Sequence, residues 1–444
     1  MCYTLTIKFY TIYKGNASMK KRILFTTILG ILGALIVLGG HYFNKILIRQ
    51  ARTPVSMIIA SDIHYLSPEY RGEYFKEPSA IFDGKLTHYS PEYFDAFLTE
   101  VIEKHPQVLI LSGDITLNGS VKSHEEVVEK LKNVQAAGID VLVIPGNHDV
   151  NSTAGDYTPE EPVIVESVYA EDFMKMYESF GPAQAISRDE NTFSYIYEAS
   201  PSLRILMIDS NCLGKGTVQD ETLAWMETQL KDAKRAGADV IAVSHQNLHI
   251  HSELLYFSYQ MYNADELLAL YEKYDVKLSL SGHIHVQSIV SKETTPGTTI
   301  PEVAVGALSV CGTPYGELSY NGKELTYQTA KTDVSAYASK QNWSDENLLN
   351  FNNYSYWYFE EVGRLQTFDG YKDSDLSTEE ITLLADTFAK INSAYFTGDD
   401  IDTDVLSEGI DLWSKNENGF FYKYIQSMLE ENNVENQTIT INLY

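Results

Sequence analysis

Short, continuous apolar runs alternate along the chain with stretches in which apolar residues recur every three or four positions. Because the runs lack the polar alternation of a half-exposed strand, they are typical of strands buried on both faces. The stretches between them predict amphipathic helices, so this is the pattern of βαβ units in an α/β fold. The predicted strands are residues 55–60, 108–111, 141–144, 203–208, 240–243 and 278–280. Two predicted helices cover residues 173–180 and 264–274, and three others begin near residues 90, 123 and 223.

Local sequence signals mark the starts of several predicted helices. Ser90 precedes a proline, which favours Ser90 as the N-cap residue and the proline as the first helical residue. Ser123 with Glu126, and Ser377 with Glu380, have the spacing of capping boxes. We therefore expect helices to begin at all three places.

Residues 65–89 are rich in Tyr, Pro and Gly and show no helical period. Because long loops in compact domains commonly carry function, we expect this segment to form a loop over the functional site. Its aromatic residues either face the substrate or only pack on the surface. They include Tyr65, Tyr70, Tyr74 and Phe75.

The chain changes character towards its C-terminal end. Between residues 286 and 328, Gly, Pro and Thr clusters break it into short strands, which predict an antiparallel edge of a domain at residues 55–330. Residues 331–444 are acidic and regain helical periods, which predict a smaller helical domain of three or four helices, and 437–444 alternate like an edge strand. The acidic composition favours a solvated surface, with partner docking or substrate gating as the alternative.

The N-terminal region predicts a membrane anchor. Lys20, Lys21 and Arg22 precede 22 residues without a Lys, Arg, Asp or Glu, and Lys45 follows them. As a helix, that length crosses a hydrocarbon core of about 30 Å. Because no small-residue cleavage site follows, we expect an uncleaved anchor at 23–44, a cytoplasmic segment at 1–22 and a tether at 45–54. The chain beyond the tether would then lie outside the cytoplasm at a bacterial cell surface, or be secreted if the segment is cleaved.

Charge and cysteine content narrow the classes of partner. The net charge of −28 argues against binding to a nucleic-acid scaffold, because no basic stripe is present for a phosphate backbone. The three cysteines are far apart and fit neither a zinc cluster nor a disulfide framework. We expect Cys212 and Cys311 to be buried thiols, with a disulfide between them as the open alternative.

Polar side chains follow five of the predicted strands. Because the carboxyl ends of strands in an open α/β sheet bind ligands, we expect these side chains to converge. In Asp-x-His and His-x-His, the alternation of an extended strand would place both side chains on one side. Carboxylates combined with imidazoles suit Mn, Fe, Zn or Ni better than Ca or Mg. So many donors indicate two ions that share a carboxylate such as Asp114. The donors are Asp62, His64, Asp114, Asn147, His245, His283 and His285.

These motifs resemble the signature of the calcineurin-like binuclear metallophosphoesterases. The resemblance covers about residues 55–330 and implies an α+β sandwich with two divalent or trivalent metal ions, Mn or Fe favoured and Zn an alternative. The matching motifs are Asp62-x-His64, Gly113-Asp114, Gly146-Asn147-His148-Asp149, His245 and Gly282-His283-x-His285. By this resemblance Asp114 bridges the two metals, the first metal is held by Asp62, His64 and His285, and the second by Asn147, His245 and His283.

The resemblance also implies roles for residues that do not hold metal. His148 would lie over the phosphate and stabilise charge or protonate the leaving oxygen, with Asp149 as its orienting partner. His249, in the loop after His245, and Asn211 are weaker candidates for substrate contacts. A solvated side chain and a turn role, respectively, are the alternatives.

Within the family, the spacing is most similar to the class III cyclic-nucleotide phosphodiesterases. The resemblance implies hydrolysis of a phosphodiester, a cyclic nucleotide first, by attack of a hydroxide that bridges the metals. A broad phosphomonoesterase or nucleotidase, and a phospholipid or cell-wall phosphodiesterase, are the enzymatic alternatives. A membrane-tethered binding module on the same scaffold is the non-enzymatic alternative, which the full set of donors disfavours.

Overall fold

The structure is a computed structural model that describes residues 52–79, 83–295, 298–416, 419–432 and 434–443. The predicted anchor at 23–44 and the segment at 1–22 lie outside these residues, so the anchor and the location outside the cytoplasm stay predictions. Within the described ranges, no helix has both the length and the apolar composition that crossing a membrane requires.

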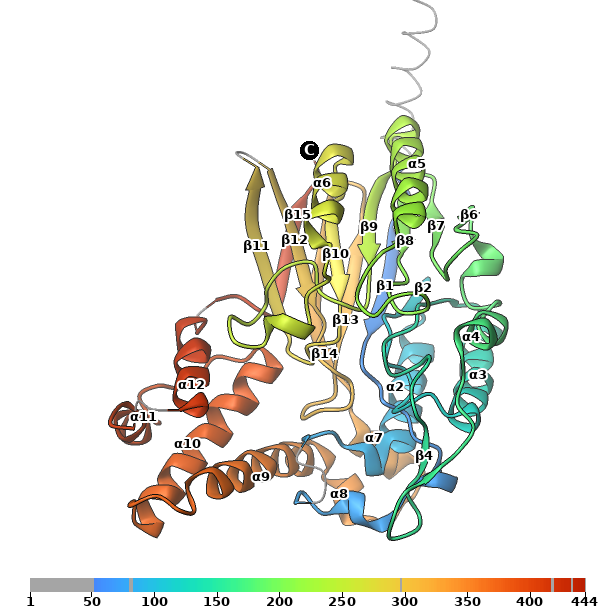
Figure 1. Ribbon diagram of the computed structural model, residues 1–444. Helices are drawn as coiled ribbons and strands as arrows, with labels where there is room; N and C mark the ends of the chain where they lie inside the picture. Colours follow the sequence, from blue (N-terminus) through green and yellow to red (C-terminus); the bar gives the residue numbers. More distant parts are fainter. Residues whose placement is uncertain (1–51, 80–82, 296–297, 417–418, 433, 444) are drawn as a thin grey trace, which may run out of the picture. The chain divides into compact units, whose positions relative to one another are not determined.

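Two large β-sheets form the centre of the described chain (Figure 1). The strand order is β15-β14-β13-β1-β2-β3 in the first sheet and β11-β12-β10-β9-β8-β7-β6 in the second. The first sheet contains β1 (Val55–Ala60), β2 (Val108–Leu111), β3 (Asp140–Val143), β13 (Pro314–Tyr320), β14 (Glu324–Lys331) and β15 (Thr438–Asn442). The second contains β6 (Ser187–Arg188), β7 (Tyr195–Ser200), β8 (Leu203–Met207), β9 (Asp239–Val243), β10 (Leu278–Ser281), β11 (Ser288–Thr295) and β12 (Thr298–Ala304). A two-stranded hairpin, β4 (Gly155–Asp156) with β5 (Val163–Ile164), is separate from both.

The main core lies between the two sheets. In β9, Ile241 and Val243 belong to this core, whereas Val240 and Ala242 pack on the opposite face with α5 (Asp220–Ala236) and α6 (Ala264–Tyr274). Helices α2 (Ser90–Lys104) and α3 (Val121–Ala136) add their apolar faces to the main core, and α4 (Ala170–Met176) contacts α3. Burial on both faces explains why the strands read as continuous apolar runs. The predicted α/β class is confirmed.

The order of the parallel strands brings the polar segments to one place. Strands β1, β2 and β3 are parallel neighbours in the first sheet, and β8, β9 and β10 are parallel neighbours in the second. The carboxyl ends of β1, β2 and β3 therefore deliver their loops to one edge, as do those of β9 and β10. The candidate metal donors thus come from both sheets, not from one open sheet.

The predicted antiparallel edge between residues 286 and 328 is wrong in its arrangement. Its strands divide between the two sheets: β11 and β12 extend the second, whereas β13 pairs antiparallel with β1 and β14 extends the first. β12 is moreover parallel to β10. The Gly, Pro and Thr clusters in the sequence locate the ends of these strands, but they do not show which sheet each strand joins.

Two of the three predicted helix starts differ from the structure. The side chain of Ser90 accepts a hydrogen bond from the Leu66 N–H, and the N-cap of α2 is Tyr89. Helix α3 is capped by Ser120, while Glu126 accepts from the hydroxyls of Tyr65 and Ser67. The capping box of Ser377 and Glu380 is confirmed at the start of α10.

The C-terminal region contains more helices than predicted. Its described residues form six: α7 (Val334–Lys340), α8 (Glu346–Leu349), α9 (Phe351–Tyr371), α10 (Thr378–Thr397), α11 (Ser407–Ser414) and α12 (Phe420–Glu430). The chain then returns as β15, which pairs with β14, so the predicted edge strand is confirmed. Because β14 and β15 are neighbours, the helices begin and end at the first sheet. Ile284 and Val286, from the loop after β10, pack in one cluster with α10 and α12.

The loop predicted at residues 65–89 contains three short 3-10 helices, at Pro68–Tyr70, Glu73–Lys76 and Thr87–Tyr89. Tyr65 and Phe75 are 2% and 3% exposed. Tyr65 donates to Glu126, and the ring of Phe75 packs edge-on against Tyr157, so these two residues build the core and do not face a substrate. The prediction that Cys212 and Cys311 are buried thiols is confirmed.

Candidate metal centre

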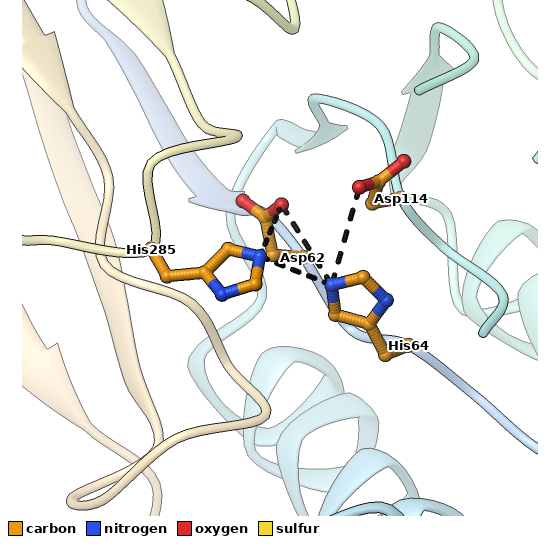
Figure 2. Close-up of side chains that lie close together, drawn as sticks. All are labelled: Asp62, His64, Asp114 and His285. Carbon is orange, nitrogen blue, oxygen red and sulfur yellow. Dashed lines mark hydrogen bonds and ion pairs between the residues drawn. The ribbon is translucent and has the colours of Figure 1, made fainter. Parts of the chain in front are cut away.

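Six side chains from four strand ends form two overlapping groups of metal-ligating atoms. Asp114 belongs to both groups, and within each group the donor atoms lie within 4.8 Å of one another. Figure 2 shows how the first group surrounds one point. That group is Asp62, His64, Asp114 and His285, and the second is Asp114, His245 and His283.

The distances in the first group indicate a shared ligand. The Nε2 atoms of His64 and His285 are 3.1 Å apart, and Nε2 of His285 is 3.3 Å from Oδ1 of Asp62. Nε2 of His64 is 4.0 Å from Oδ2 of Asp114. Oδ1 of Asp62 is buried without a hydrogen-bond partner among the described residues. Because buried polar atoms ordinarily have a partner, this orphaned oxygen among imidazole nitrogens fits a bound cation.

The second group is equally close. Nε2 of His245 is 3.3 Å from Oδ2 of Asp114 and 3.2 Å from Oδ1 of Asn147. The other ring nitrogen of His245 is 2.9 Å from the backbone oxygen of Ser112, which fixes the ring orientation as is usual for metal-binding histidines. The structure thus brings Asn147 beside His245, and the donor set fits a second ion.

The backbone at these positions is not the extended strand end that the sequence suggested. Asp62, His64, Asp114, His283 and His285 all have positive φ, between 47° and 69°. The side chains of each i, i+2 pair therefore converge through left-handed turns and not through strand alternation. Hydrogen bonds hold the turns: the Asp62 N–H donates to the Gly113 oxygen, and the His64 N–H to the Asp114 oxygen.

Two glycines allow the loops to pack this closely. A Cβ atom on Gly146 would lie 2.1 Å from Oδ1 of Asp114, and one on Gly282 would lie 1.7 Å from Oγ of Ser61. Neither space admits a side chain. The glycines before Asn147 and His283 are therefore needed for the close approach of the loops to the donors.

Both carboxylates are held in the charged form. Burial by itself would raise the pKa of Asp114, but the imidazoles of His245 and His148 outweigh it and hold that pKa well below its usual range. The pKa of Asp62 is also lowered, because His285 outweighs the effect of burial. Ionised carboxylates are the form that binds metal.

The imidazoles divide into two kinds. Burial lowers the pKa of His64 well below its ordinary value and that of His283 to about 4, so both rings are neutral. Burial also opposes charge on His245, but Asp114 outweighs it and raises its pKa to about 9. A cation bound beside Asp114 would take the place of that proton, because metal ligation requires the neutral ring.

Asp149 is not the orienting partner of His148. Nδ1 of His148 is 2.8 Å from Oδ1 of Asn118, whose Nδ2 donates to the hydroxyl of Tyr157 at 3.0 Å. The buried carboxylate of Asp149 instead accepts from the backbone N–H groups of residues 115, 116 and 146. Burial and the charge of Asp114 raise the pKa of Asp149 to about 7. Asp149 therefore ties the loops after β2 and β3 together, and Asn118 holds His148.

The two weaker substrate candidates do not line the pocket. Nε2 of His249 is 2.8 Å from the backbone oxygen of Ile300 in β12, and the ring is buried. Asn211 donates to the backbone oxygen of Pro145 and accepts from Nε2 of Gln246. The predicted substrate contacts of His249 and Asn211 are corrected to structural roles, and Asn211 acts by fixing Gln246.

A cavity of about 410 Å³ opens over the two groups of donors, and several of its residues were missed from the sequence. They share no motif, and they come from the loop at 65–89 and from the loops after β8 and β9. Tyr259 lies against His283, with ring centroids 5.0 Å apart. The missed lining residues include Lys85, Lys215, Gln246, Tyr259 and Tyr262. The one sequence signal that could have identified any of them is the positive charge of Lys85 and Lys215, in loops that accompany the metal motifs.

Residues 56–287 match the family described as calcineurin-like phosphoesterase, and 333–435 match the C-terminal domain of cyclic nucleotide phosphodiesterase. No curated protein matches the chain. Among solved structures, a dimetal phosphatase from Danio rerio is 11% identical with a TM-score of 0.46, covering 63% of this chain and 97% of that one. A purple acid phosphatase from yellow lupin (Lupinus luteus) seeds is 13% identical with a TM-score of 0.41, covering 63% and 52%.

A two-sheet α/β fold with a site for two metals defines a metal-dependent phosphoester hydrolase. The chain belongs to the calcineurin-like phosphoesterase family, in the branch that carries the C-terminal domain of cyclic nucleotide phosphodiesterases. The family predicted from the motifs is therefore confirmed.

Proposed function

We propose that this protein hydrolyses a phosphodiester, with a cyclic nucleotide as the substrate class. The observation that carries the hydrolysis is the position of Asp114, shared by both groups of donors. The cyclic-nucleotide substrate is supported by the match of residues 333–435 to the C-terminal domain of cyclic nucleotide phosphodiesterase.

The lining of the catalytic cavity supports the same substrate class. Lys85 and Lys215 supply positive charge beside the donors, which suits an anionic phosphate. Tyr259 and Tyr262 supply aromatic faces on which a planar base stacks, and Gln246 supplies hydrogen-bonding groups. The volume of about 410 Å³ lies within the range of small-molecule sites.

In the proposed mechanism His148 gives the proton to the leaving alcohol. When bound, two metal ions would neutralise the phosphoryl oxygens and acidify a water. The amide of Asn118 is oriented by its donation to Tyr157, so its oxygen faces Nδ1 of His148 and accepts that N–H. In the imidazolium form, Nε2–H is then the proton donor to the leaving oxygen.

The assignment is tested with the purified full-length protein, loaded with Mn²⁺, on a panel of phosphoesters. We expect faster turnover of 3′,5′-cyclic AMP, 2′,3′-cyclic AMP and bis-p-nitrophenyl phosphate than of AMP and p-nitrophenyl phosphate. Preference for the monoesters would identify a phosphomonoesterase or nucleotidase instead, and preference for a glycerophosphodiester a lipid or cell-wall enzyme. Two bound metals without turnover of any ester would identify a binding module. The matched control is Asp114→Asn, which keeps the side-chain shape but removes the shared charge.

A further inference from the structure

A second cavity, of about 540 Å³, lies among the C-terminal helices. Its walls come from α9, α10 and α12, from residues 83 and 84, and from Leu255. Its volume lies within the range of small-molecule sites. Aromatic side chains make up much of the lining: Phe359, Phe388, Phe396, Phe420, Phe421 and Tyr424. The mechanism of hydrolysis uses none of these residues.

The polar groups of this cavity are acidic or neutral. Asp83 and Asp369 line it together with the amides of Gln366 and Asn392, and its described lining contains no Lys, Arg or His. Asn392 is 9% exposed, and its amide oxygen has no hydrogen-bond partner among the described residues. A buried acceptor without a partner is costly, so a ligand that brings an N–H donor is favoured there.

These features select one chemical class of ligand. The side chains of Asp83 and Asp369 repel anionic ligands such as phosphates and carboxylates, so the second cavity is not an extension of the phosphate site. Aromatic faces attract organic cations, and an ammonium group carries several N–H donors, which suit acceptors such as an amide oxygen and a carboxylate. The rings of Phe420 and Tyr424 are stacked, with centroids 5.6 Å apart, and offer a flat wall for an aromatic body.

The cavity shares an ion pair with the catalytic pocket. Nζ of Lys85 is 3.0 Å from Oδ2 of Asp83, and the Lys85 N–H donates to Oδ1 of Asp83. Asp83 lines the second cavity, whereas Lys85 lines the catalytic one. Between them, Gly84 has a φ of 71°, and a Cβ atom on it would lie 2.8 Å from the ring of Phe359, so the segment is held against α9.

We propose that this second cavity binds an organic ammonium ion with an aromatic body, and that the bound cation competes with Lys85 for Asp83. Lys85 then interacts more strongly with the anionic substrate, so the ligand activates the enzyme by lowering KM. Only ion-pair partners exchange, and no covalent step is involved.

The test uses the full-length protein with tryptamine as the probe and its neutral analogue tryptophol as the comparison. Isothermal titration calorimetry should show tryptamine binding at least about tenfold more tightly than tryptophol, the value of one charge-assisted hydrogen bond. Asn392→Leu should weaken tryptamine binding by about tenfold and leave basal turnover unchanged. Without ligand, Asn392→Leu should also raise Tm, because it removes a buried amide oxygen that has no partner among the described residues.

The coupling is tested through KM for bis-p-nitrophenyl phosphate. Tryptamine should lower KM of the wild type but not that of Asp83→Asn, whose KM is already low because Lys85 has lost its ion-pair partner. The matched control is Asp275→Asn, which removes an ion pair of the same i, i+2 spacing with Lys277 and should respond to tryptamine like the wild type.

Equal affinities for tryptamine and tryptophol, or unaltered tryptamine binding by Asn392→Leu, would overturn the binding site. Tryptamine binding without any change in KM would overturn the coupling. The calorimetric result does not depend on the substrate, so an error in the proposed function cannot be mistaken for a failure of this inference.

Discussion

The hydrogen bond between Asn118 and His148 allows a sharp test of the proposed general acid. Asn118→Leu keeps the size of the side chain but removes the oxygen that lies 2.8 Å from Nδ1 of His148. A hydrogen bond to a charged group contributes about 1.5–3 kcal/mol, and the bond stabilises the imidazolium that protonates the leaving oxygen. At about 1.4 kcal/mol per factor of ten, kcat for an alkyl leaving group should fall about 10- to 100-fold.

The assay compares two phosphodiesters with different leaving groups. 3′,5′-Cyclic AMP releases an alkoxide that needs a proton, whereas bis-p-nitrophenyl phosphate releases a stable phenolate that does not. We therefore expect the loss for Asn118→Leu to be confined to the cyclic nucleotide. Metal content, measured by inductively coupled plasma mass spectrometry, should equal that of the wild type, since Asn118 belongs to neither group of donors.

Asp149→Asn separates this interpretation from the one that the sequence suggested. If Asp149 oriented His148, its replacement would produce the leaving-group dependence. Because Asp149 instead accepts three backbone N–H groups, we expect lower Tm and equal losses for both substrates. Equal losses for both substrates in Asn118→Leu, or a leaving-group dependence only in Asp149→Asn, would refute the role given to Asn118.

Three further outcomes are expected. Asp114→Asn should bind fewer than two metals per chain by mass spectrometry and lose turnover by at least about 10³-fold, since it removes the shared charge; two bound metals with normal turnover would contradict this. Gly146→Ala should lower Tm and turnover, because its Cβ would lie 2.1 Å from Asp114, whereas Gly363→Ala, with 3.4 Å of clearance, serves as the calorimetric control. Burial would raise the pKa of Glu302, but its hydrogen bonds with His251 and with backbone N–H groups outweigh burial and lower that pKa from 4.5. The ionised Glu302 carboxylate therefore stabilises the fold above pH 4.5, and this stabilisation is lost as pH falls through the lower folded pKa. The Tm difference between wild type and Glu302→Gln should accordingly shrink below pH 4.5, and a difference that grows there would contradict the assignment.

The parts of the fold that depend on periodicity were predictable from the sequence. The apolar period of residues 264–274 gave α6 with its observed ends, and the pattern around Ser377 gave the start of α10. Both signals arise from neighbours in sequence, within one or two helical turns.

Features that depend on contacts between distant segments were predicted wrongly or not at all. Ser123 and Glu126 have capping-box spacing, yet Glu126 bonds Tyr65 and Ser67, which reach it from another segment. In the same way, β13 joins the free edge of β1, far earlier in the chain. Spacing within a segment carries no information on such pairings, so the caps of α2 and α3 and the pairing of β13 with β1 could not be predicted.

The identity of the donors was predictable, but the way in which the backbone presents them was not. Among the described residues, ten other than glycine have positive φ, and five of these are Asp62, His64, Asp114, His283 and His285. Left-handed backbone costs an L-residue about 1–2 kcal/mol, so the protein keeps five costly turns within one site. Hydrogen bonds such as Asp62 N–H to the Gly113 oxygen offset part of this cost. Because an extended strand end would present the same residues without strain, the turns are maintained for the directions in which they point the donors. The backbone therefore marks these positions as a functional site independently of their residue types.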